Sequence, residues 1–480
     1  MNYKMIGYVL GQIFKVEAAI LLLSLIVSVC CGENLLLAFI IPIVLLVGIS
    51  IPMTRKKPQN INLFAKEGFV IVALSWIVLS LFGALPFWIS REVPSFMDAF
   101  FETVSGFTTT GATVIRDVEA LSRGLLFWRS FTHWIGGMGV LVFVLAIFPE
   151  QETQSIFLMK AESPGPQVGK IVSKLKITAR ILYAIYVALT LLEFILLLCG
   201  GMPFFDSLVN SLATAGTGGF AIWNDGIAHY QSAYVEYVIA IFMMLFGVNF
   251  NVFYLILIKR FADALRCEEM RVYFCIIGAS TLIITLNTFN IYKTFGRTFR
   301  TAFFQVCSII TTTGFSTVDF NSWPTLSKTV LVVLMLFGAC AGSTAGGLKI
   351  ARLILLIKSG LAELRRCISP NSVISIKFEG KPVEQSVIRS TSGYLVAYFS
   401  VMLISMLAIS INGFDFESTV VSVISCFNNI GPGLGKLFES NPTFSDFSVF
   451  SKIVLSFDMI AGRLEIFPVL LLISPKTYKY

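Results

Sequence analysis

Apolar residues form long runs in this chain, and short segments rich in charged and polar residues separate them. A helix needs about 20 apolar residues to cross the hydrocarbon core of a bilayer. We therefore predict an all-α polytopic membrane protein with ten spans: Ile6–Val29, Leu35–Met53, Gly68–Ile89, Leu125–Phe148, Ile177–Cys199, Tyr234–Ile258, Val272–Phe289, Ser327–Ile357, Ile388–Ile411 and Val449–Ile473.

Four shorter apolar runs lie between spans and lead into strings of small, polar and glycine residues. The runs are too short to cross: Phe96–Val104, Phe204–Ala213, Thr301–Ile310 and Phe416–Phe427. Each string centres on one glycine: Gly111, Gly219, Gly314 or Gly431. These glycines recur about every 100 residues, which indicates one supersecondary unit used four times. The unit that we predict is a helix, a short re-entrant pore helix, a glycine-centred loop and a second helix.

This repeat divides the chain into five parts. Residues 1–60 are predicted to form a two-helix preface, and residues 61–150, 151–265, 266–370 and 371–480 form four pore repeats, the third with an interrupted helix. Irregular backbone survives at membrane depth only where protein buries it or where it lines a wet cavity. We therefore expect a pseudo-fourfold arrangement of the repeats around one pore. The alternative is that the glycines mark tight turns outside the membrane.

Composition agrees with a membrane protein and predicts its orientation. Charged residues make up 13% of the chain, against about 25% in soluble domains, and the mean hydropathy is +0.82. Lysine and arginine are concentrated in loops at 55–66, 160–180, 259–271 and 358–389. The positive-inside rule places these loops in the cytoplasm, and both termini with them. The net charge of +8 is thus explained without nucleic-acid binding. The N-terminus is expected to be a retained first helix rather than a cleaved signal peptide.

Enzymatic chemistry and a transition-metal site are not expected. The nine cysteines form no C-x-x-C pair and there are only two histidines, which argues against zinc. No serine or threonine has a histidine and an acid at the spacing of a hydrolase motif. The glycine-rich run that ends at Gly347 resembles a nucleotide-binding P-loop, but Leu348 stands where the motif needs lysine.

The glycine strings are the predicted ion-binding site. Glycine can adopt positive φ angles, so that successive carbonyl groups can face a pore, and a ring of carbonyls can replace the hydration shell of a monovalent cation. Threonine adds hydroxyl ligands, and the C-terminal ends of the short helices favour a cation. The candidate ligands are Thr109, Thr110, Gly111, Thr217, Gly218, Gly219, Thr312, Thr313, Gly314, Asn429, Ile430 and Gly431.

The strings SGFTTTGATV, ITTTGFST and NNIGPGLG resemble the filter segments of the Trk/Ktr/HKT superfamily of potassium transporters. Further matches are HWIGGMGV at 133–140, CAGSTAGGLK at 340–349 and GRLEIF at 462–467. The resemblance covers nearly the whole chain, and the two-helix preface is most similar to the bacterial TrkH type. The string TAGTGGF differs most from the other three strings. Placing Gly219 rather than Gly218 at its filter position is therefore a choice of alignment. In the superfamily, glycine at all four positions goes with potassium selectivity, which the resemblance therefore implies here.

The resemblance also implies an assembly. It implies a homodimer in the bacterial plasma (inner) membrane and a cytosolic TrkA-type regulatory subunit that binds NAD or adenine nucleotides. Membrane lipids are expected at the basic loops. The chain itself is expected to hold no cofactor and to conduct K⁺, the transported ion, through a passive gated pore that Rb⁺ also permeates. The alternatives are K⁺ symport coupled to H⁺ or Na⁺, and a receptor or scaffold without transport.

A run of small residues, rich in glycine, interrupts the eighth span, and glycine disfavours a uniform helix. One interpretation is close helix packing through small residues. We favour a broken helix whose loop lies under the glycine strings, and in the resembled family this segment is the gate. The predicted gate residues are Gly338, Gly342, Ser343, Thr344, Ala345, Gly346, Gly347 and Arg463.

Arg463 lies inside the tenth span, two residues before Glu465. A charge within a span is costly and faces a cavity or a partner. We expect Arg463 to project into the pore, oppose cation passage and hold the gate loop; the alternative is local pairing with Glu465. Other polar residues are expected to be interfacial anchors (Arg129, Lys349, Arg352), a packing residue (His133), or solvated residues that can concentrate cations (Asp98, Glu102).

Overall fold

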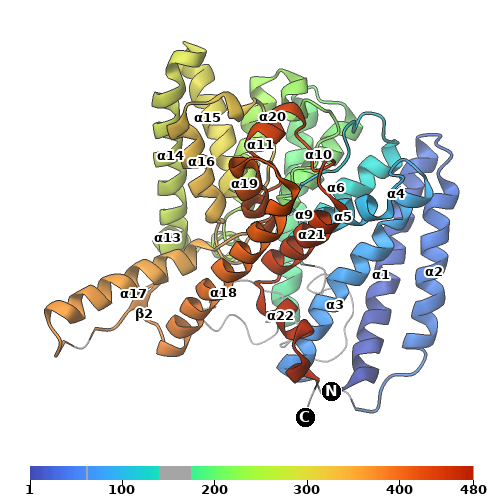
Figure 1. Ribbon diagram of the computed structural model, residues 1–480, viewed down its shortest axis with the longest axis horizontal. Helices are drawn as coiled ribbons and strands as arrows, with labels where there is room; N and C mark the ends of the chain where they lie inside the picture. Colours follow the sequence, from blue (N-terminus) through green and yellow to red (C-terminus); the bar gives the residue numbers. More distant parts are fainter. Residues whose placement is uncertain (61–62, 140–174, 373, 479–480) are drawn as a thin grey trace.

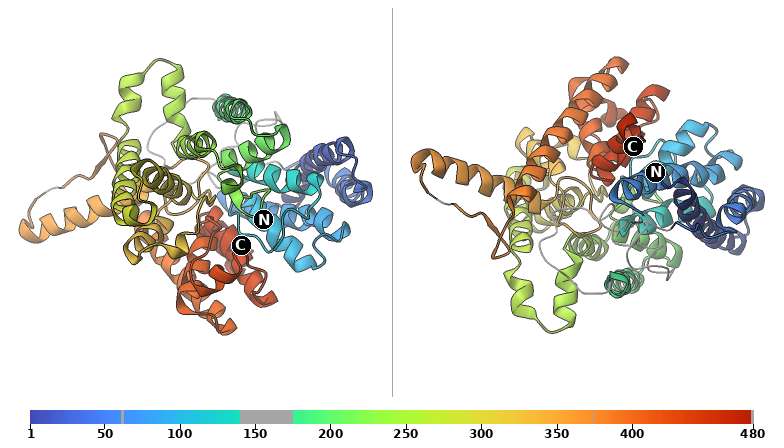
Figure 2. Two further views of the ribbon diagram at one scale, coloured as in Figure 1. Left: turned by 90° about the horizontal axis from the view of Figure 1, so that it is seen from above. Right: turned by 90° about the horizontal axis from the view of Figure 1, so that it is seen from below.

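The computed structural model describes residues 1–60, 63–139, 175–372 and 374–478. The regular elements of this part of the chain are helices, apart from one hairpin of β1 (Lys377–Phe378) and β2 (Lys381–Pro382). Seen from above, the repeats follow one another around a common centre in chain order, from blue through green and yellow to red (Figure 2). Both termini lie at the same end of the molecule (Figure 1). The predicted all-α fold, with four repeats arranged around a common centre, is confirmed.

The two-helix preface forms a hairpin at one side of the molecule (Figure 1). Its helices are α1 (Tyr3–Cys30) and α2 (Leu36–Thr54). Gly11 lets the two helices approach closely, because a Cβ added there would lie 2.8 Å from Thr54 Cγ2. On α2, the side chains of Leu37 and Val44 are 69% and 62% exposed, which fits a surface in contact with lipid.

Each repeat contains a long first helix, a pore helix and a second helix. Repeat one has α3 (Ala65–Gly83), α4 (Leu85–Ile89), the pore helix α5 (Phe96–Phe107) and α6 (Arg123–Gly137). Repeat two has α9 (Leu175–Cys199), the pore helix α10 (Phe204–Gly216), α11 (Ala233–Phe246) and α12 (Phe250–Leu257). Repeat three has α14 (Glu268–Tyr292), the pore helix α15 (Phe295–Ile310), α16 (Thr325–Leu336) and α17 (Ile350–Ile368). Repeat four has α18 (Gln385–Ile409), the pore helix α19 (Phe416–Phe427), α21 (Val449–Arg463) and α22 (Phe467–Ile473).

Short helices connect these elements. They are α13 (Phe261–Arg266), α20 (Lys436–Ser440), η1 (Gly226–Tyr230), η2 (Phe320–Ser322), η3 (Ser410–Asn412) and η4 (Pro475–Thr477).

Six described helices are long and apolar enough to cross a membrane as continuous spans, and the bent pair of α11 and α12 adds a seventh. They match predicted spans one, two, three, five, six, seven and nine. The fourth predicted span is described only up to residue 139, so its second half lies outside the described residues. The eighth is broken between α16 and α17, as predicted. The chain is therefore a multi-pass membrane protein.

The sixth span was predicted to be continuous, and this prediction is wrong. It breaks between α11 and α12 with a bend of 92°. The break contains Gly247, whose added Cβ would lie 2.4 Å from the hydroxyl of Tyr273, and Asn249. The Asn249 side chain accepts a hydrogen bond of 3.0 Å from the Asn251 N–H and so caps the start of α12. Gly247 thus ends α11, and Asn249 begins α12.

The tenth span is also interrupted, contrary to the prediction of one continuous helix. Glu465 and Ile466, between α21 and α22, have φ angles of 56° and 67°. A β-branched residue in the left-handed region is strained, so surrounding contacts must hold this break in place.

All four predicted pore helices are present. α15 begins at Phe295, six residues before its predicted start, and α19 has the predicted bounds. The second helices of repeats one and four pass the ends of the pore helices at glycine. An added Cβ would lie 1.8 Å from the Phe107 carbonyl oxygen at Gly136 and 1.8 Å from the Phe427 carbonyl oxygen at Gly462. The two glycines therefore occupy equivalent places and allow backbone-to-backbone contact.

Candidate functional site

The four pore helices end in the same backbone motif. A residue just beyond each helix has a positive φ: 56° at Thr109, 53° at Thr217, 55° at Thr312 and 57° at Asn429. The next N–H donates to the carbonyl five residues back at 2.9–3.0 Å, from Thr110 to Ser105, Gly218 to Ala213, Thr313 to Ser308 and Ile430 to Ser425. This is the Schellman motif, in which glycine normally takes the left-handed position. Threonine and asparagine there store strain of about 1–3 kcal/mol each.

The glycine after this motif closes a ring of four loops, which we call the glycine loops: Thr109–Gly111, Thr217–Gly219, Thr312–Gly314 and Asn429–Gly431. Each glycine again has a positive φ, from 77° to 102°. An added Cβ would lie 2.1 Å from Gly218 O at Gly111, 1.9 Å from Thr313 O at Gly219, 2.0 Å from Ile430 O at Gly314 and 2.5 Å from Thr110 O at Gly431. Each loop thus touches the next in chain order, and the fourth touches the first.

The ring settles which residues are equivalent. Gly219 has the positive φ and contacts the next loop, whereas Gly218 presents its carbonyl oxygen to Gly111. Gly218 therefore corresponds to Thr110, Thr313 and Ile430. The structure brings all twelve candidate ligands into one ring, in the alignment chosen from the sequence.

Side chains around the ring differ between repeats. In repeats one and three, hydroxyl pairs brace the loop: Thr108 with Thr110 at 2.8 Å and Thr311 with Thr313 at 2.7 Å. Repeat two has Gly216 and Gly218 at these places, and repeat four has Asn428 and Ile430. Asn429 Nδ2 donates to Thr110 Oγ1 at 3.0 Å, which links the fourth loop to the first. The backbone thus follows a fourfold pattern that the side chains only partly repeat.

A buried ion pair supports the first glycine loop from behind. Arg129 and Glu102 lie 2.7 Å apart, with side chains 2% and 0% exposed. Glu102 also accepts from the Thr113 hydroxyl and the Val114 N–H, both at 3.0 Å. Arg129 donates to Ala221 O at 3.1 Å, in the chain after the second loop. The predictions of an interfacial anchor for Arg129 and a solvated role for Glu102 are wrong, because each supplies the charge that the other needs when buried.

His133 joins the first pore helix to the second glycine loop. Its Nε2 accepts from the Phe220 N–H at 3.3 Å, so the ring is neutral with its proton on Nδ1, which donates to Gly106 O at 2.7 Å. The ring also packs against that of Phe220 in a tilted arrangement, with 4.2 Å between centroids and 34° between the ring planes. The predicted packing role is therefore correct but omits the two hydrogen bonds.

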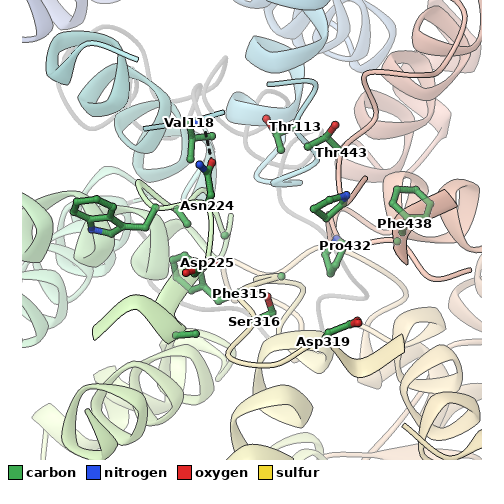
Figure 3. Close-up of a pocket in the computed structure, with 18 of the residues that line it drawn as sticks. Thr113, Val118, Asn224, Asp225, Phe315, Ser316, Asp319, Pro432, Phe438 and Thr443 are labelled. Carbon is green, nitrogen blue, oxygen red and sulfur yellow. Dashed lines mark hydrogen bonds between the residues drawn. The ribbon is translucent and has the colours of Figure 1, made fainter. Parts of the chain in front are cut away.

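A cavity of about 600 Å³ lies over the ring. Residues from all four repeats line it, among them Thr113, Asn224, Ser316 and Pro432 (Figure 3). Its wall includes the carboxylates of Asp225, Asp319 and Glu439 as well as Arg116 and Arg129. Gly219 and Gly314 form part of its floor. The cavity therefore borders one side of the ring.

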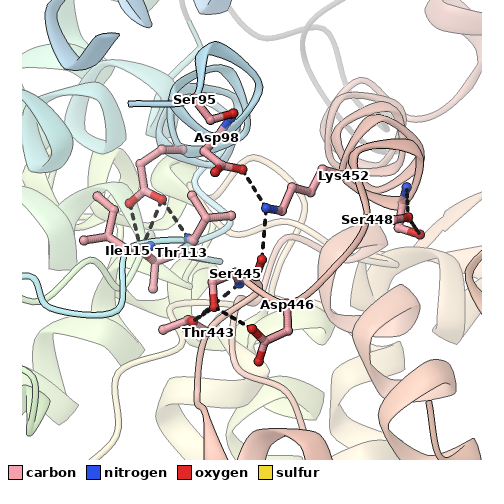
Figure 4. Close-up of polar contacts among 12 residues, drawn as sticks. Ser95, Asp98, Thr113, Ile115, Thr443, Ser445, Asp446, Ser448 and Lys452 are labelled. Carbon is pink, nitrogen blue, oxygen red and sulfur yellow. Dashed lines mark hydrogen bonds and ion pairs between the residues drawn. The ribbon is translucent and has the colours of Figure 1, made fainter. Parts of the chain in front are cut away.

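Polar contacts at the rim of this cavity tie repeat four to repeat one (Figure 4). Lys452 donates to Asp98 at 2.6 Å and to Ser445 O at 3.1 Å. Phe444 N–H donates to Thr113 O at 2.8 Å. Asp98 is thus paired rather than freely solvated. Nearby, hydrogen bonds from Asn441 and the charge of Arg116 hold the pKa of Asp446 below its usual value.

The other side of the ring is covered by residues 337–349, which we call the intramembrane loop. Its Gly346 N–H donates to Thr312 Oγ1 at 2.7 Å. A Cβ added at Gly346 would lie 2.7 Å from Asn428 O. The favoured interpretation of the eighth span, a broken helix under the glycine strings, matches this placement.

The intramembrane loop is folded against the break between α11 and α12. Cys340 N–H donates to Gly247 O, and Phe250 N–H donates to Gly342 O, both at 3.1 Å. Gly338 N–H donates to Leu348 O at 2.8 Å and closes the loop on itself. Ser343 and Ala345 lie within the same loop, and Ser343 Oγ donates to Cys340 O at 2.6 Å. Two broken helices thus satisfy each other's free backbone groups.

Arg463 connects the intramembrane loop to repeat one. Its guanidinium donates to Thr344 O at 2.7 Å, and to Gly136 O and Gly137 O at 2.6 and 2.7 Å. Glu465, the partner in the local-pairing alternative, forms an ion pair with Arg352 of α17. Arg463 therefore holds the loop by its carbonyls, as expected.

Two cations, at the end of the loop and just after it, are not interfacial anchors, contrary to the prediction. Lys349 is 2% exposed and donates to Ala345 O. Arg352 is 9% exposed and lies over the ring of Tyr394, 3.8 Å from its centroid. Lys349 therefore binds the loop itself, and Arg352 binds residues of repeat four. Among the described residues, no group of three histidine, cysteine or acidic side chains is placed to hold a metal ion.

Comparison with known proteins gives consistent matches. The family model of TrkH, a cation transport protein, matches residues 33–279 and 281–479. The Trk system potassium uptake protein TrkH of Escherichia coli (strain K12) is 38% identical over 426 residues, which cover 87% of this chain and 87% of that protein. TrkH of Salmonella typhimurium is 37% identical over 437 residues, 89% and 88% of the two chains. The crystal structure of the potassium transporter TrkH from Vibrio parahaemolyticus matches with a TM-score of 0.89 and 30% identity over 100% of both chains.

The buried pair behind the first loop predicts a stability effect. Replacing Glu102 by Ala leaves Arg129 buried without its counter-charge, and we expect a loss of about 3–5 kcal/mol. Thermal unfolding of the purified protein in detergent measures it. The control is Asp446→Ala, which breaks an ion pair with 67% and 36% exposed side chains and should cost about 0–1 kcal/mol. Equal shifts in melting temperature for both variants would contradict the assigned role of the Glu102–Arg129 pair.

Proposed function

The chain belongs to the TrkH family of cation transport proteins, and from this premise we propose that it takes up potassium through the ring of glycine loops. It is a membrane transport protein rather than an enzyme. The observation that carries the proposal is the closed ring in which each glycine contacts the carbonyl of the next loop. A four-sided ring of carbonyls is the arrangement that can strip and replace the water of a monovalent cation.

Selectivity in this proposal comes from the backbone. The carbonyls of Thr110, Gly218, Thr313 and Ile430 are held at a fixed spacing because glycine in the neighbouring loop leaves no room for movement or for a side chain. The four pore helices end at the ring, and their C-terminal ends add negative potential. Glycine in all four loops favours K⁺ as the transported ion.

Gating in this proposal is a movement of the intramembrane loop. Gly346 is bonded to the ring itself, and Thr344 is bonded to Arg463. A cation leaving the ring must therefore displace the loop or find it already moved. Arg463 opposes passage in two ways, by its positive charge and by holding the loop closed. Once the loop moves, ions flow passively down their electrochemical gradient.

A coupled K⁺ symporter is the alternative. It is favoured by buried acidic side chains in the helices: both oxygens of Glu193 and one oxygen of Asp458 have no hydrogen-bond partner in the described part of the chain. Such groups could carry a proton or Na⁺. Against this, Asp458 accepts from Ser405 Oγ at 2.7 Å, and neither acid is among the residues of the ring.

The remaining expectations are part of the same proposal. In this proposal the protein forms a homodimer in the bacterial inner membrane, with both termini and the basic loops in the cytoplasm. A cytosolic TrkA-type subunit would supply nucleotide control. Lipid headgroups would contact the basic loops.

Ion flux into liposomes that contain only the purified chain tests the filter. We expect uptake of K⁺ and Rb⁺ to exceed that of Na⁺ and Li⁺ by at least about tenfold, equivalent to about 1.4 kcal/mol, without a gradient of H⁺ or Na⁺. Gly314→Ser should abolish the preference or the flux, because its side chain would strike Ile430 O. The control is Gly296→Ser, in the first turn of the same pore helix, where an added Cβ meets nothing within 4 Å.

Two results would count against a passive filter. One is unchanged selectivity in Gly314→Ser. The other is K⁺ uptake by the unmodified chain that appears only when a gradient of H⁺ or Na⁺ is imposed, which would favour the symporter.

Replacing Arg463 tests the gate. Arg463→Ala should raise K⁺ flux several-fold, because it removes both the charge and three hydrogen bonds to carbonyls. Arg463→Lys keeps the charge but cannot bind all three carbonyls as a planar fork, so an intermediate flux is expected. Tracer uptake by equal amounts of folded protein is the measurement. Flux in Arg463→Ala equal to that of the unmodified chain would refute the assigned role.

A further inference from the structure

The intramembrane loop has a second anchor that the proposed gating does not use. Oε1 of Glu269, in the first turn of α14, accepts hydrogen bonds from the N–H groups of Ala341 at 2.6 Å and Ala351 at 3.0 Å. Ala341 lies early in the loop and Ala351 lies just after it, in the first turn of α17. One carboxylate oxygen thus links the early part of the loop to the residues that directly follow it. Glu269 is 3% exposed, so water competes little for these bonds.

A second carboxylate fixes the position of Glu269. Glu379 accepts hydrogen bonds from the backbone N–H groups of Glu268 at 2.9 Å and Glu269 at 3.2 Å. It therefore caps the start of α14 from outside, using N–H groups that a helix leaves unpaired. In the first turn of α14, backbone N–H groups therefore donate to Glu379, while the side chain of Glu269 accepts hydrogen bonds from both ends of the loop.

Glu379 belongs to the tip of the β1–β2 hairpin. The tip is a tight turn, with φ of 50° at Glu379 and 75° at Gly380. Lys358 of α17 fastens the same hairpin, because its Nζ donates to Lys377 O at 2.8 Å and pairs with Glu268 at 2.5 Å. The hairpin is partly exposed at the surface, and Lys381 beside the tip is exposed to solvent. A force on the hairpin therefore reaches the start of α14 directly.

These contacts form one continuous path from the surface to the ring. It runs from the hairpin tip through Glu379 to the start of α14, through the Glu269 carboxylate to the loop, and through Gly346 to Thr312 of the third glycine loop. Every step joins a backbone N–H group to a side-chain oxygen, so a displacement of the hairpin is transmitted through the Glu379 and Glu269 carboxylates and the Thr312 hydroxyl.

We infer that Glu269 is a positioning residue that holds the intramembrane loop closed, and that Glu379 on the hairpin controls it. Withdrawal of the hairpin removes the cap of α14, shifts Glu269 and releases both ends of the loop. The inference rests on the proposed function, in which this loop is the gate. It assigns to the β1–β2 hairpin the role of the input through which an event at that surface changes conduction.

Rb⁺ uptake into liposomes containing only the full chain tests this inference. Glu269→Ala and Glu379→Ala should each raise uptake several-fold over the unmodified chain. The double variant should not exceed the larger single effect, because both substitutions act on one path and are not independent. Lys381→Ala, on the same hairpin, is the matched control and should leave uptake unchanged.

A conservative substitution separates positioning from general loss of structure or charge. Glu379→Gln keeps a carbonyl oxygen that can accept from both N–H groups, so uptake should return to the level of the unmodified chain. If charge alone mattered, Glu379→Gln would behave like Glu379→Ala. Hydrogen exchange of peptides within 338–351 gives a second readout that does not depend on conduction, and Glu379→Ala should make these amides exchange faster.

The outcomes distinguish failure of this inference from failure of the proposed function. If Arg463→Ala conducts but Glu269→Ala and Glu379→Ala match Lys381→Ala in both uptake and exchange, the hairpin does not control the loop. Glu379→Gln behaving like Glu379→Ala in both readouts would likewise overturn the positioning role. If no variant conducts, including Arg463→Ala, the pore is wrong, while faster exchange in Glu379→Ala alone would still support the physical coupling.

Discussion

The structure depends on the contact between a glycine in each loop and the carbonyl of the next. At Gly219 the space left for a side chain is smallest, since an added Cβ would lie 1.9 Å from Thr313 O. Four such contacts in a cycle fix the width of the ring, because no loop can move inward or outward without meeting its neighbour. The left-handed residue before each glycine, such as Thr109, stores strain that this closure compensates. The buried Glu102–Arg129 pair and His133 then support the ring from outside.

Much of this architecture follows from the sequence, because its determinants are local. Long apolar runs define spans by length alone, and the four glycine strings repeat the same backbone requirement. The ring positions could be aligned through Gly111, Gly314 and Gly431, which left only the choice between Gly218 and Gly219. The glycine-rich run of the eighth span predicted a break because glycine is unfavourable in a helix interior.

The features that the sequence did not reveal depend on partners far away in the chain. The break after Phe246 is stable only because the intramembrane loop, about 90 residues later, bonds to its free backbone groups. Glu102 and Arg129 look like separate surface charges until the fold buries them together. Glu269 stands at the start of an apolar span and has the pattern of an ordinary helix-start acid. A charged residue set within an apolar run, as Glu102 and Arg129 are, is the sequence signal that could have pointed to these roles.

The most direct test of the central claim is to locate the ion. Anomalous X-ray diffraction from crystals of the protein grown in Rb⁺ would place the cation without relying on flux. The account predicts a peak on the axis of the ring, among the carbonyls of Thr110, Gly218, Thr313 and Ile430, that persists when Na⁺ is present in large excess over Rb⁺. Rb⁺ bound elsewhere with none in the ring, or a ring peak that an equal concentration of Na⁺ removes, would contradict a potassium filter built from these four loops.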